Sequence, residues 1–423
     1  MWKKIVVIVA LGALSIWGQP PAGGRGGSGR GGRGFGFGGP AIKSPEISAD
    51  GKVTVRLRAP NAKEVTVTGL GQGLTLTKDD AGVWSGTSEA LKPDVYMYQF
   101  RVDGMTINDP SNPHLATSFG SGGRSVLTLP GAPWSPKPGV PAGAVTRHPY
   151  HSDLIGDDRE FFVYTPPNYD PHRKEPYPVL YLLHGLGDDA QSWLTQGNAN
   201  IILDNLIAEG KAKPMIMVNP LGYGHQGGGA GPTDMIVHFA DALLNEVMPR
   251  VEKEYNVAKD RDHRAIAGLS MGGAESTFTG LNHLDKFAYI GSFSGAYVMW
   301  PGANNGGRGA GAPRGPAAAP AGPPPAGASG GRGGRGGRGG TPTVNAAIID
   351  QDFGNLTSKA NSQIKLLWIV CGTADSLIGV NRQFKDWLTA RNVKFTQEEV
   401  PDMAHVWPLW RQNLTDLAPQ LFR

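Results

Sequence analysis

Residues 264–273 read RAIAGLSMGG. An apolar strand leads into the pattern Gly-x-Ser-x-Gly, and a helical pattern follows it. In such a unit a sharp turn lifts the serine hydroxyl above the edge of a sheet, and Gly268 and Gly272 leave room where side chains would collide. The stretch therefore predicts a strand–turn–helix unit with Ser270 as a nucleophile and the N–H of Met271 as one donor to an oxyanion.

Strand and helix patterns alternate on both sides of this stretch, from Tyr150 to the end of the chain. The apolar runs are residues 161–164, 178–183, 214–218, 264–267, 288–292 and 365–370. The helical patterns are residues 199–208, 235–255, 274–281 and 381–390. Strands that are apolar throughout indicate a parallel sheet with helices on both faces. The predicted fold class of residues 150–423 is therefore α/β, with a mainly parallel sheet.

A different pattern precedes this domain at residues 42–130. Short segments alternate apolar and polar residues, as at Val53, Val55 and Leu57, and turn residues such as Asp103 separate them. This pattern predicts a small all-β sandwich. Residues 131–149 are predicted to be a linker between the two domains.

Glycine and proline are abundant, with 62 and 34 of 423 residues, and they gather in residues 20–40 and 301–343. Residues 20–41 are therefore predicted to be a linker, and residues 301–343 a disordered insert in the α/β domain. The two Gly-rich stretches hold eight arginines and no acidic residue, so the rest of the chain is mildly acidic despite a net charge of +4. This excludes a basic nucleic-acid-binding domain and favours solvated linkers over RNA-binding tails.

The first residues indicate export. Lys3 and Lys4 precede an apolar run of 14 residues, which suits a signal peptide and is too short to span a bilayer. Residues 1–19 are predicted to be this signal, and the mature protein is predicted to be secreted or periplasmic, without stable membrane insertion. A short membrane anchor or a buried helix is the alternative. Cys371 is the single cysteine, so no disulfide can form within the chain.

A second motif lies at residues 181–187, which read YLLHGLG. A strand that ends in His-Gly-x-Gly is the place where hydrolases carry their other oxyanion donor. We predict that the Leu186 N–H is this donor, with Gly187 as the alternative. His184 is predicted to have a structural role, because it precedes the glycines that must approach the substrate.

A serine needs a base, and the base needs an acid that orients it. His405 lies in a loop before the last helical segment and is the predicted base. Asp375 lies just past the end of a predicted strand and is the predicted acid, with Asp402 as its rival in the same loop as His405. The order Ser270, Asp375, His405 is that of the α/β-hydrolases.

Three aromatic residues are predicted to line a substrate pocket, because aromatic rings stack on acyl groups and on sugars: Trp193, Tyr223 and Trp407. Simple packing is the alternative for each of them. No group of histidines has the spacing of zinc ligands beside an acidic partner, so no metal and no other cofactor is predicted.

With these motifs in view, residues 141–423 resemble the exported feruloyl/acetyl-xylan esterase and enterochelin-esterase-like family, of the esterase D type with an α/β-hydrolase fold. The resemblance is carried by residues 163–169, 180–187, 197–208, 264–273, 371–378 and 405–411. It places the family's nucleophile, acid and base on Ser270, Asp375 and His405. The insert at residues 301–343 departs from the family pattern near the expected rim of the active site.

Residues 42–130 resemble the immunoglobulin-like, glycogen-binding-type module that precedes such esterases, through residues 82–84, 96–100 and 102–112. The two resemblances imply a secreted serine esterase that removes feruloyl or acetyl groups from plant polysaccharide such as xylan. Its partners would be an acylated polysaccharide or a small ester, and no nucleic acid. A siderophore trilactone esterase and a non-catalytic carbohydrate-binding protein are the alternatives.

Overall fold

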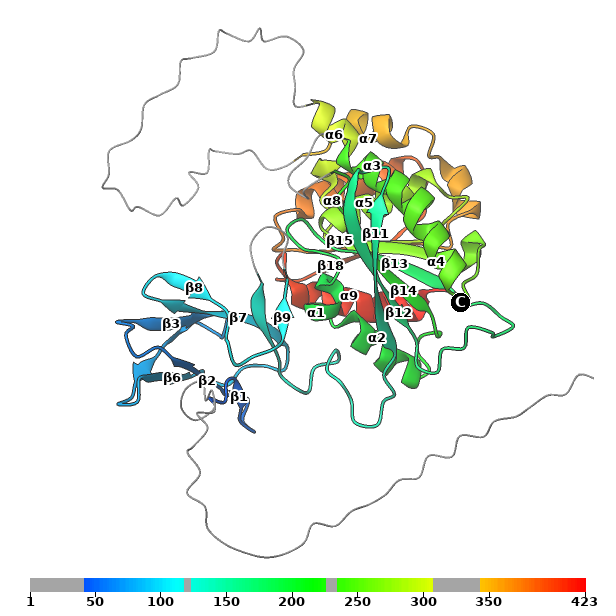
Figure 1. The fold of residues 1–423 in the computed structure, drawn as a ribbon. Coiled ribbons are helices and arrows are strands. Elements are labelled where there is room, and N and C mark those ends of the chain that lie inside the picture. The colour runs from blue at the N-terminus through cyan, green and yellow to red at the C-terminus, as the bar shows by residue number, and fades with distance from the viewer. Residues whose placement is uncertain (1–41, 118–122, 226–233, 307–342) are drawn as a thin grey trace, which may run out of the picture. The chain divides into compact units, whose positions relative to one another are not determined.

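The computed structural model describes four ranges of the chain, residues 42–117, 123–225, 234–306 and 343–423 (Figure 1). The predicted signal peptide, the linker at residues 20–41 and most of the insert at residues 301–343 lie outside these ranges. Residues 42–423 form one compact unit.

The centre of the α/β domain is an eight-stranded sheet with the strand order β11-β12-β14-β13-β15-β16-β17-β18. Its strands are β11 (Ala144–Ser152), β12 (Asp157–Thr165), β13 (Val179–Leu183), β14 (Ile216–Pro220), β15 (Arg264–Leu269), β16 (Tyr289–Phe293), β17 (Leu366–Gly372) and β18 (Thr396–Val400). Only the pairings of β12 with β11 and with β14 are antiparallel. All the others are parallel, as the continuous apolar runs predict.

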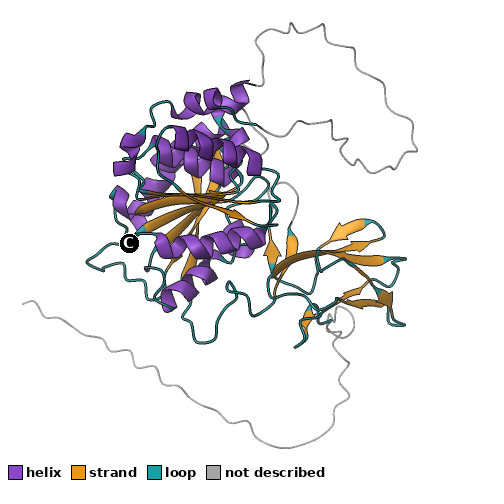
Figure 2. Ribbon diagram, turned by 180° about the vertical axis from the view of Figure 1, so that it is seen from behind, coloured by secondary structure: helices purple, strands orange, loops and turns teal. Residues whose placement is uncertain are grey.

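Helices cover both faces of this sheet (Figure 2). They are α1 (Ser192–Thr195), α2 (Ala199–Ala208), α3 (Met235–Ala242), α4 (Met248–Glu254), α5 (Met271–Asn282), α6 (Pro301–Gly306), α7 (Ala346–Phe353), α8 (Ile378–Ala390) and α9 (Trp407–Leu417). One core cluster packs β13 against α3, α5 and α8, and a second packs it against α2 and α9. Alternate residues of the buried strand, such as Tyr181 and Leu182, enter the two clusters in turn. Within the described ranges, no helix is both long and apolar enough to cross a membrane.

The sheet begins earlier than the sequence suggests. Strand β11 starts at Ala144, inside the predicted linker of residues 131–149, and pairs with β12 along its whole length. Most of its side chains are exposed, because it lies at the edge of the sheet, so it lacks the apolar run by which the other strands were predicted. The second edge strand, β18, was missed for the same reason.

The N-terminal part consists of two antiparallel sheets, of strand orders β1-β2-β6-β5 and β4-β3-β7-β10-β9, with β8 beside β7. Their bounds are β1 (Glu46–Ile47), β2 (Val53–Arg58), β3 (Val65–Thr68), β4 (Leu74–Thr75), β5 (Thr77–Lys78), β6 (Val83–Thr87), β7 (Val95–Val102), β8 (Met105–Ile107), β9 (Leu115–Ala116) and β10 (Arg124–Thr128). The two sheets share one apolar core, which contains Trp84 and Phe100. These strands are consistent with the predicted all-β sandwich, and its immunoglobulin-like relationship stays a prediction.

Candidate active site

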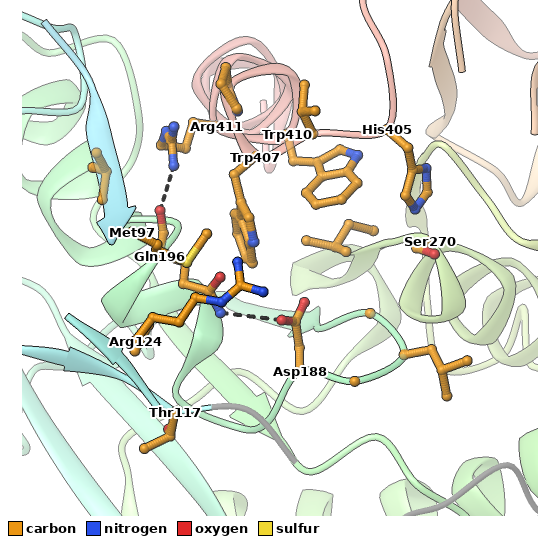
Figure 3. A pocket seen from close by; sticks show the side chains of 18 residues that line it. Met97, Thr117, Arg124, Asp188, Gln196, Ser270, His405, Trp407, Trp410 and Arg411 are labelled. Carbon is orange, nitrogen blue, oxygen red and sulfur yellow. Dashed lines mark hydrogen bonds between the residues drawn. The ribbon is translucent and has the colours of Figure 1, made fainter. Parts of the chain in front are cut away.

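A cavity of about 510 Å³ lies at the carboxyl end of β15, where Ser270 follows the strand. Ser270 and His405 both line it, and Figure 3 shows their side chains close together at one end. The other lining residues are Leu269 at the end of β15, Gln196 directly after α1, and residues of the loop after β13, of the start of α9 and of the β-sandwich. A position beyond the carboxyl ends of strands is where open α/β sheets bind ligands.

The backbone at Ser270 has the sharp turn that the motif predicts. Its φ is 52° and its ψ is −113°, a backbone conformation that residues other than glycine rarely adopt. Three backbone hydrogen bonds hold it: its N–H donates to Phe293 O at 2.9 Å, and its carbonyl accepts from the N–H groups of Ala296 at 2.8 Å and Ala274 at 3.1 Å. A Cβ at Gly272 would lie 2.6 Å from the carbonyl oxygens of Leu183 and His184, at the end of β13, so only glycine fits there.

The predicted oxyanion donors flank this turn. Met271 is the first residue of α5, so its N–H has no acceptor within the helix. The N–H of Leu186 makes no hydrogen bond within the described chain. The alternative donor, Gly187, is already engaged, because its N–H donates to the Tyr223 hydroxyl at 2.8 Å. The geometry thus favours Leu186 over Gly187.

His405 and Asp375 form a hydrogen-bonded pair, with 2.8 Å between His405 Nδ1 and Asp375 Oδ2. The side chain of Asp375 is fully buried, whereas that of His405 is 32% exposed. Burial alone would raise the pKa of Asp375, but hydrogen bonds from His405 and from the Leu377 N–H outweigh it and hold that pKa below its usual value. The carboxyl group is therefore ionised and suited to hold an imidazolium. The rival acid Asp402 is exposed.

The Ser270 hydroxyl and the His405 ring make no hydrogen bond in this structure, although both face the same end of the cavity. Such bonds often tighten only when substrate is in place. The structure thus brings together the three side chains that the motifs predict, with the acid–base contact formed and the base–nucleophile contact open.

His184 fixes the loop of residues 185–188, which we call the oxyanion loop. Its ring is buried, its Nε2 accepts a hydrogen bond from the Gly222 N–H at 2.8 Å, and its Nδ1 lies 2.8 Å from Gly185 O. Burial lowers the pKa of His184 to about 4, so the ring is neutral and can accept and donate one hydrogen bond each. Its position agrees with the structural role that the sequence indicates.

Of the three predicted pocket aromatics, only Trp407 lines the cavity. Trp193 is buried behind it, where its indole N–H donates to Leu183 O at 2.8 Å and its ring packs edge-on against Trp407. Tyr223 is buried beside the oxyanion loop, where its hydroxyl accepts from the Gly187 N–H and donates to Asp188 O. Both residues therefore pack behind the site and do not line the cavity. The sequence indicates that these rings lie near the site, but it does not indicate which way they face.

Several lining residues lie outside the predicted site, among them Met97, Arg124 and Asp188. Asp188 directly follows the His-Gly-x-Gly motif, so the sequence could have been used to predict that it lies near the site. Met97 and Arg124 belong to the sandwich, and no local pattern connects them with the hydrolase motifs.

Comparison with known proteins places this geometry among the esterases. Residues 152–316 match the Esterase family model, described as "Putative esterase". The chain is 35% identical over 273 residues to an endo-1,4-beta-xylanase/feruloyl esterase of Xylanibacter ruminicola, which covers 62% of this chain and 37% of the relative. It is 31% identical over 167 residues to endo-1,4-beta-xylanase Y of Acetivibrio thermocellus, which covers 37% of this chain and 14% of the relative. The chain therefore spans well under half the length of these curated relatives.

Two solved structures share the fold. A ferulic acid esterase from Anaeromyces mucronatus in complex with ferulic acid matches with a TM-score of 0.52 and 22% identity, over 70% of this chain and 96% of that one. The enterobactin esterase of Shigella flexneri matches with a TM-score of 0.54 and 18% identity, over 86% of this chain and 93% of that one. Family model, relatives and solved structures together support an esterase with the α/β-hydrolase fold.

Proposed function

We propose that this chain is a secreted serine esterase that removes feruloyl or acetyl groups from plant polysaccharide such as xylan. The observation that carries the chemistry is the His405–Asp375 pair, which faces the same cavity as the strained Ser270. The substrate class is supported by the relative that is 35% identical over 273 residues and is named a xylanase/feruloyl esterase. The predicted signal at residues 1–19 supports secretion.

In this mechanism the Ser270 hydroxyl attacks the carbonyl carbon of the ester while His405 takes its proton. The carbonyl oxygen becomes an oxyanion and accepts hydrogen bonds from the N–H groups of Met271 and Leu186. The tetrahedral intermediate then collapses to an acyl-enzyme, and His405 returns the proton to the departing alcohol oxygen. Water, deprotonated by His405, attacks the acyl-enzyme in the same way and releases the acid. Asp375 holds the imidazolium in both halves of the reaction.

The cavity suits an aromatic acyl ester. Its wall at the start of α9 is formed by Val406, Trp407 and Trp410, which offer apolar and aromatic surface beside His405. The two indole rings pack edge-on with 5.3 Å between their centres, so their orientation is fixed before a ligand binds.

The test is release of ferulate and acetate from feruloylated, acetylated arabinoxylan by the mature protein. Ser270→Ala should lower release by at least about 10⁴-fold, because the nucleophile is lost. Ser362→Ala, at an exposed serine far from the cavity-lining residues, is the matched control and should keep wild-type activity. Equal release by Ser270→Ala and wild type would overturn the assignment of the nucleophile.

A second candidate keeps the chemistry and changes the substrate to a siderophore trilactone. It is favoured by one observation, the fold shared with enterobactin esterase over 86% of this chain, which reaches beyond the α/β domain into the sandwich. Turnover of a catecholate trilactone, with no ferulate or acetate released from arabinoxylan, would favour this candidate. If neither these substrates nor a simple aryl acetate is hydrolysed, a carbohydrate-binding protein on a hydrolase scaffold becomes the alternative to test.

A further inference from the structure

The active-site cavity has a second wall that comes from the β-sandwich. The sandwich residues that line it are Val95, Met97, Ala116, Thr117 and Arg124. They lie on β7, β9 and β10 or directly beside them, and these three strands are neighbours in one sheet. The same cavity contains Ser270 and His405, so a substrate bound there meets both domains.

This wall exists because strands of the sandwich have two faces, one in the core of the sandwich and one that packs against the α/β domain. Tyr98 and Phe100 of β7 belong to the core of the sandwich, whereas Val95 belongs to a core cluster of the α/β domain and Met97 packs against that cluster. Val126 of β10, which pairs with Met97, belongs to the same α/β cluster. Side chains two residues apart share a face of a strand, so Arg124 lies on the face that meets the α/β domain.

A buried ion pair holds this face in place. Arg411 of α9 donates to Asp94 at 2.5 Å, just before β7, with 1% and 18% of the two side chains exposed. The same guanidinium donates to Gln196 O at 2.6 Å and lies 5.2 Å from the centre of the Trp134 ring. Asp94 also accepts from the Trp134 indole N–H at 2.9 Å. The sandwich wall is therefore fixed to the helix that follows His405.

Arg124 brings a charge into the cavity that nothing in the described chain neutralises. Figure 3 shows its guanidinium directed into the space between Trp407 and Asp188. Its side chain is exposed and makes no ion pair or hydrogen bond within the described ranges. A guanidinium at a cavity wall offers several N–H donors in fixed geometry to a ligand.

Asp188 faces the same space from the oxyanion loop. Its carboxylate accepts from Gln196 Nε2 at 3.2 Å and has no cation within ion-pair distance in the described ranges. Burial raises the pKa of Asp188 to about 6, and the nearby His405 counteracts part of this rise. Asp188 and His405 thus line the same cavity.

We propose that Arg124 of the β-sandwich and Asp188 of the oxyanion loop together bind the sugar that carries the ester, so that the sandwich completes the active site. This inference rests on the proposed function. The two side chains line the same cavity and form no ion pair with each other, so both can contact one ligand. A sugar hydroxyl can accept a hydrogen bond from the guanidinium and donate one to the carboxylate.

The test compares two esters with the same acyl group, methyl ferulate and ferulate carried on the arabinose of a xylo-oligosaccharide. The measured quantity is the ratio of kcat/KM for the sugar ester to kcat/KM for the methyl ester. Arg124→Met and Asp188→Asn should each lower this ratio about tenfold or more, because each removes a hydrogen bond of a charged group to the sugar. Arg124→Lys, which keeps the charge, should recover part of the loss.

Arg101→Met is the matched control, because Arg101 is an exposed arginine of β7 that does not line the cavity. Its ratio should stay within about twofold of wild type. If Arg124→Met has the wild-type ratio while the wild type cleaves the sugar ester, the inference falls and the proposed function stands. If the wild type cleaves methyl ferulate and never the sugar ester, both fall.

Discussion

The two walls of the cavity are built in different ways. On the catalytic wall, Ser270 and Asp375 each lie within a few residues of a strand end, and short backbone contacts set their positions. The sandwich wall consists of side chains on strand faces, and it is held by the ion pair of Asp94 with Arg411, 317 positions apart in the chain. Catalytic groups are thus placed by local structure, and the opposite wall is placed by docking of one domain on another.

This difference predicts two kinds of mutational effect. Changes of Ser270, His405 or Asp375 should reduce turnover of every ester, because these residues act on the reacting atoms. Changes on the sandwich wall should alter stability or the choice between esters. Three further variants test this division, in order of decreasing effect.

The largest effect is expected for Asp375→Asn. An amide cannot stabilise the imidazolium of His405 and favours the wrong tautomer, so kcat should fall by about 10⁴-fold on sugar and methyl esters alike. Steady-state kinetics on methyl ferulate measures this loss. The pKa of Asp375 is held low in the folded protein, so the stability it contributes is present at neutral pH and is lost as the pH falls through that lowered pKa.

Asp402→Asn is the matched control, because Asp402 lies in the same loop as His405 and is exposed. Its kcat should stay within about twofold of wild type. A loss in Asp402→Asn as large as that in Asp375→Asn would mean that the acid has been misassigned.

An intermediate effect is expected for Arg411→Met. The substitution leaves Asp94 without its cation between the two domains, which should lower the free energy of unfolding by about 3 kcal/mol. Urea unfolding measures this loss. Arg382→Met is the control, because Arg382 pairs with Glu399 at 2.5 Å but is 54% exposed, and exposed pairs contribute below about 1 kcal/mol. Equal losses in the two variants would show that the pair does not anchor the sandwich.

The smallest effect is expected for Glu275→Gln, at a residue that lies behind Ser270 and does not line the cavity, so it should change stability rather than turnover. Glu275 lies in α5 behind Ser270, is fully buried, and neither of its oxygens has a hydrogen-bond partner among the described residues. Burial raises the pKa of Glu275 well above its usual value, so the folded protein keeps the proton that the unfolded chain releases. Stability is therefore highest below the usual glutamate pKa and falls as the pH rises toward the raised one.

Glutamine is neutral at every pH, so Glu275→Gln should lose this dependence. The variant should unfold like wild type at pH 5 and be more stable by about 1 kcal/mol or more at pH 8, as measured by urea unfolding at both pH values. An identical fall of stability with pH in both proteins would show that Glu275 is not the source of this dependence.

Much of the α/β domain could be predicted from the sequence. Strands β13 to β17 are apolar on both faces, so they stand out as continuous runs, and helix α2 coincides with its predicted range of residues 199–208. The edge strands β11 and β18 were missed because their exposed residues carry no apolar pattern. Helix α7 also lacked a prediction, since it directly follows the Gly-rich insert.

The sequence by itself determined the groups whose chemistry depends on local backbone geometry. The Gly-x-Ser-x-Gly turn is encoded in five consecutive residues, because no larger side chain than glycine fits at Gly272 against the neighbouring strand. The choice of Asp375 over Asp402, in contrast, needed the observed contact with His405. Only the tertiary structure decided which aromatic rings face the cavity and that Arg124 faces it too. Those positions depend on how the sandwich and the α/β sheet pack against each other, and packing between distant segments leaves no periodic or local signal in the chain.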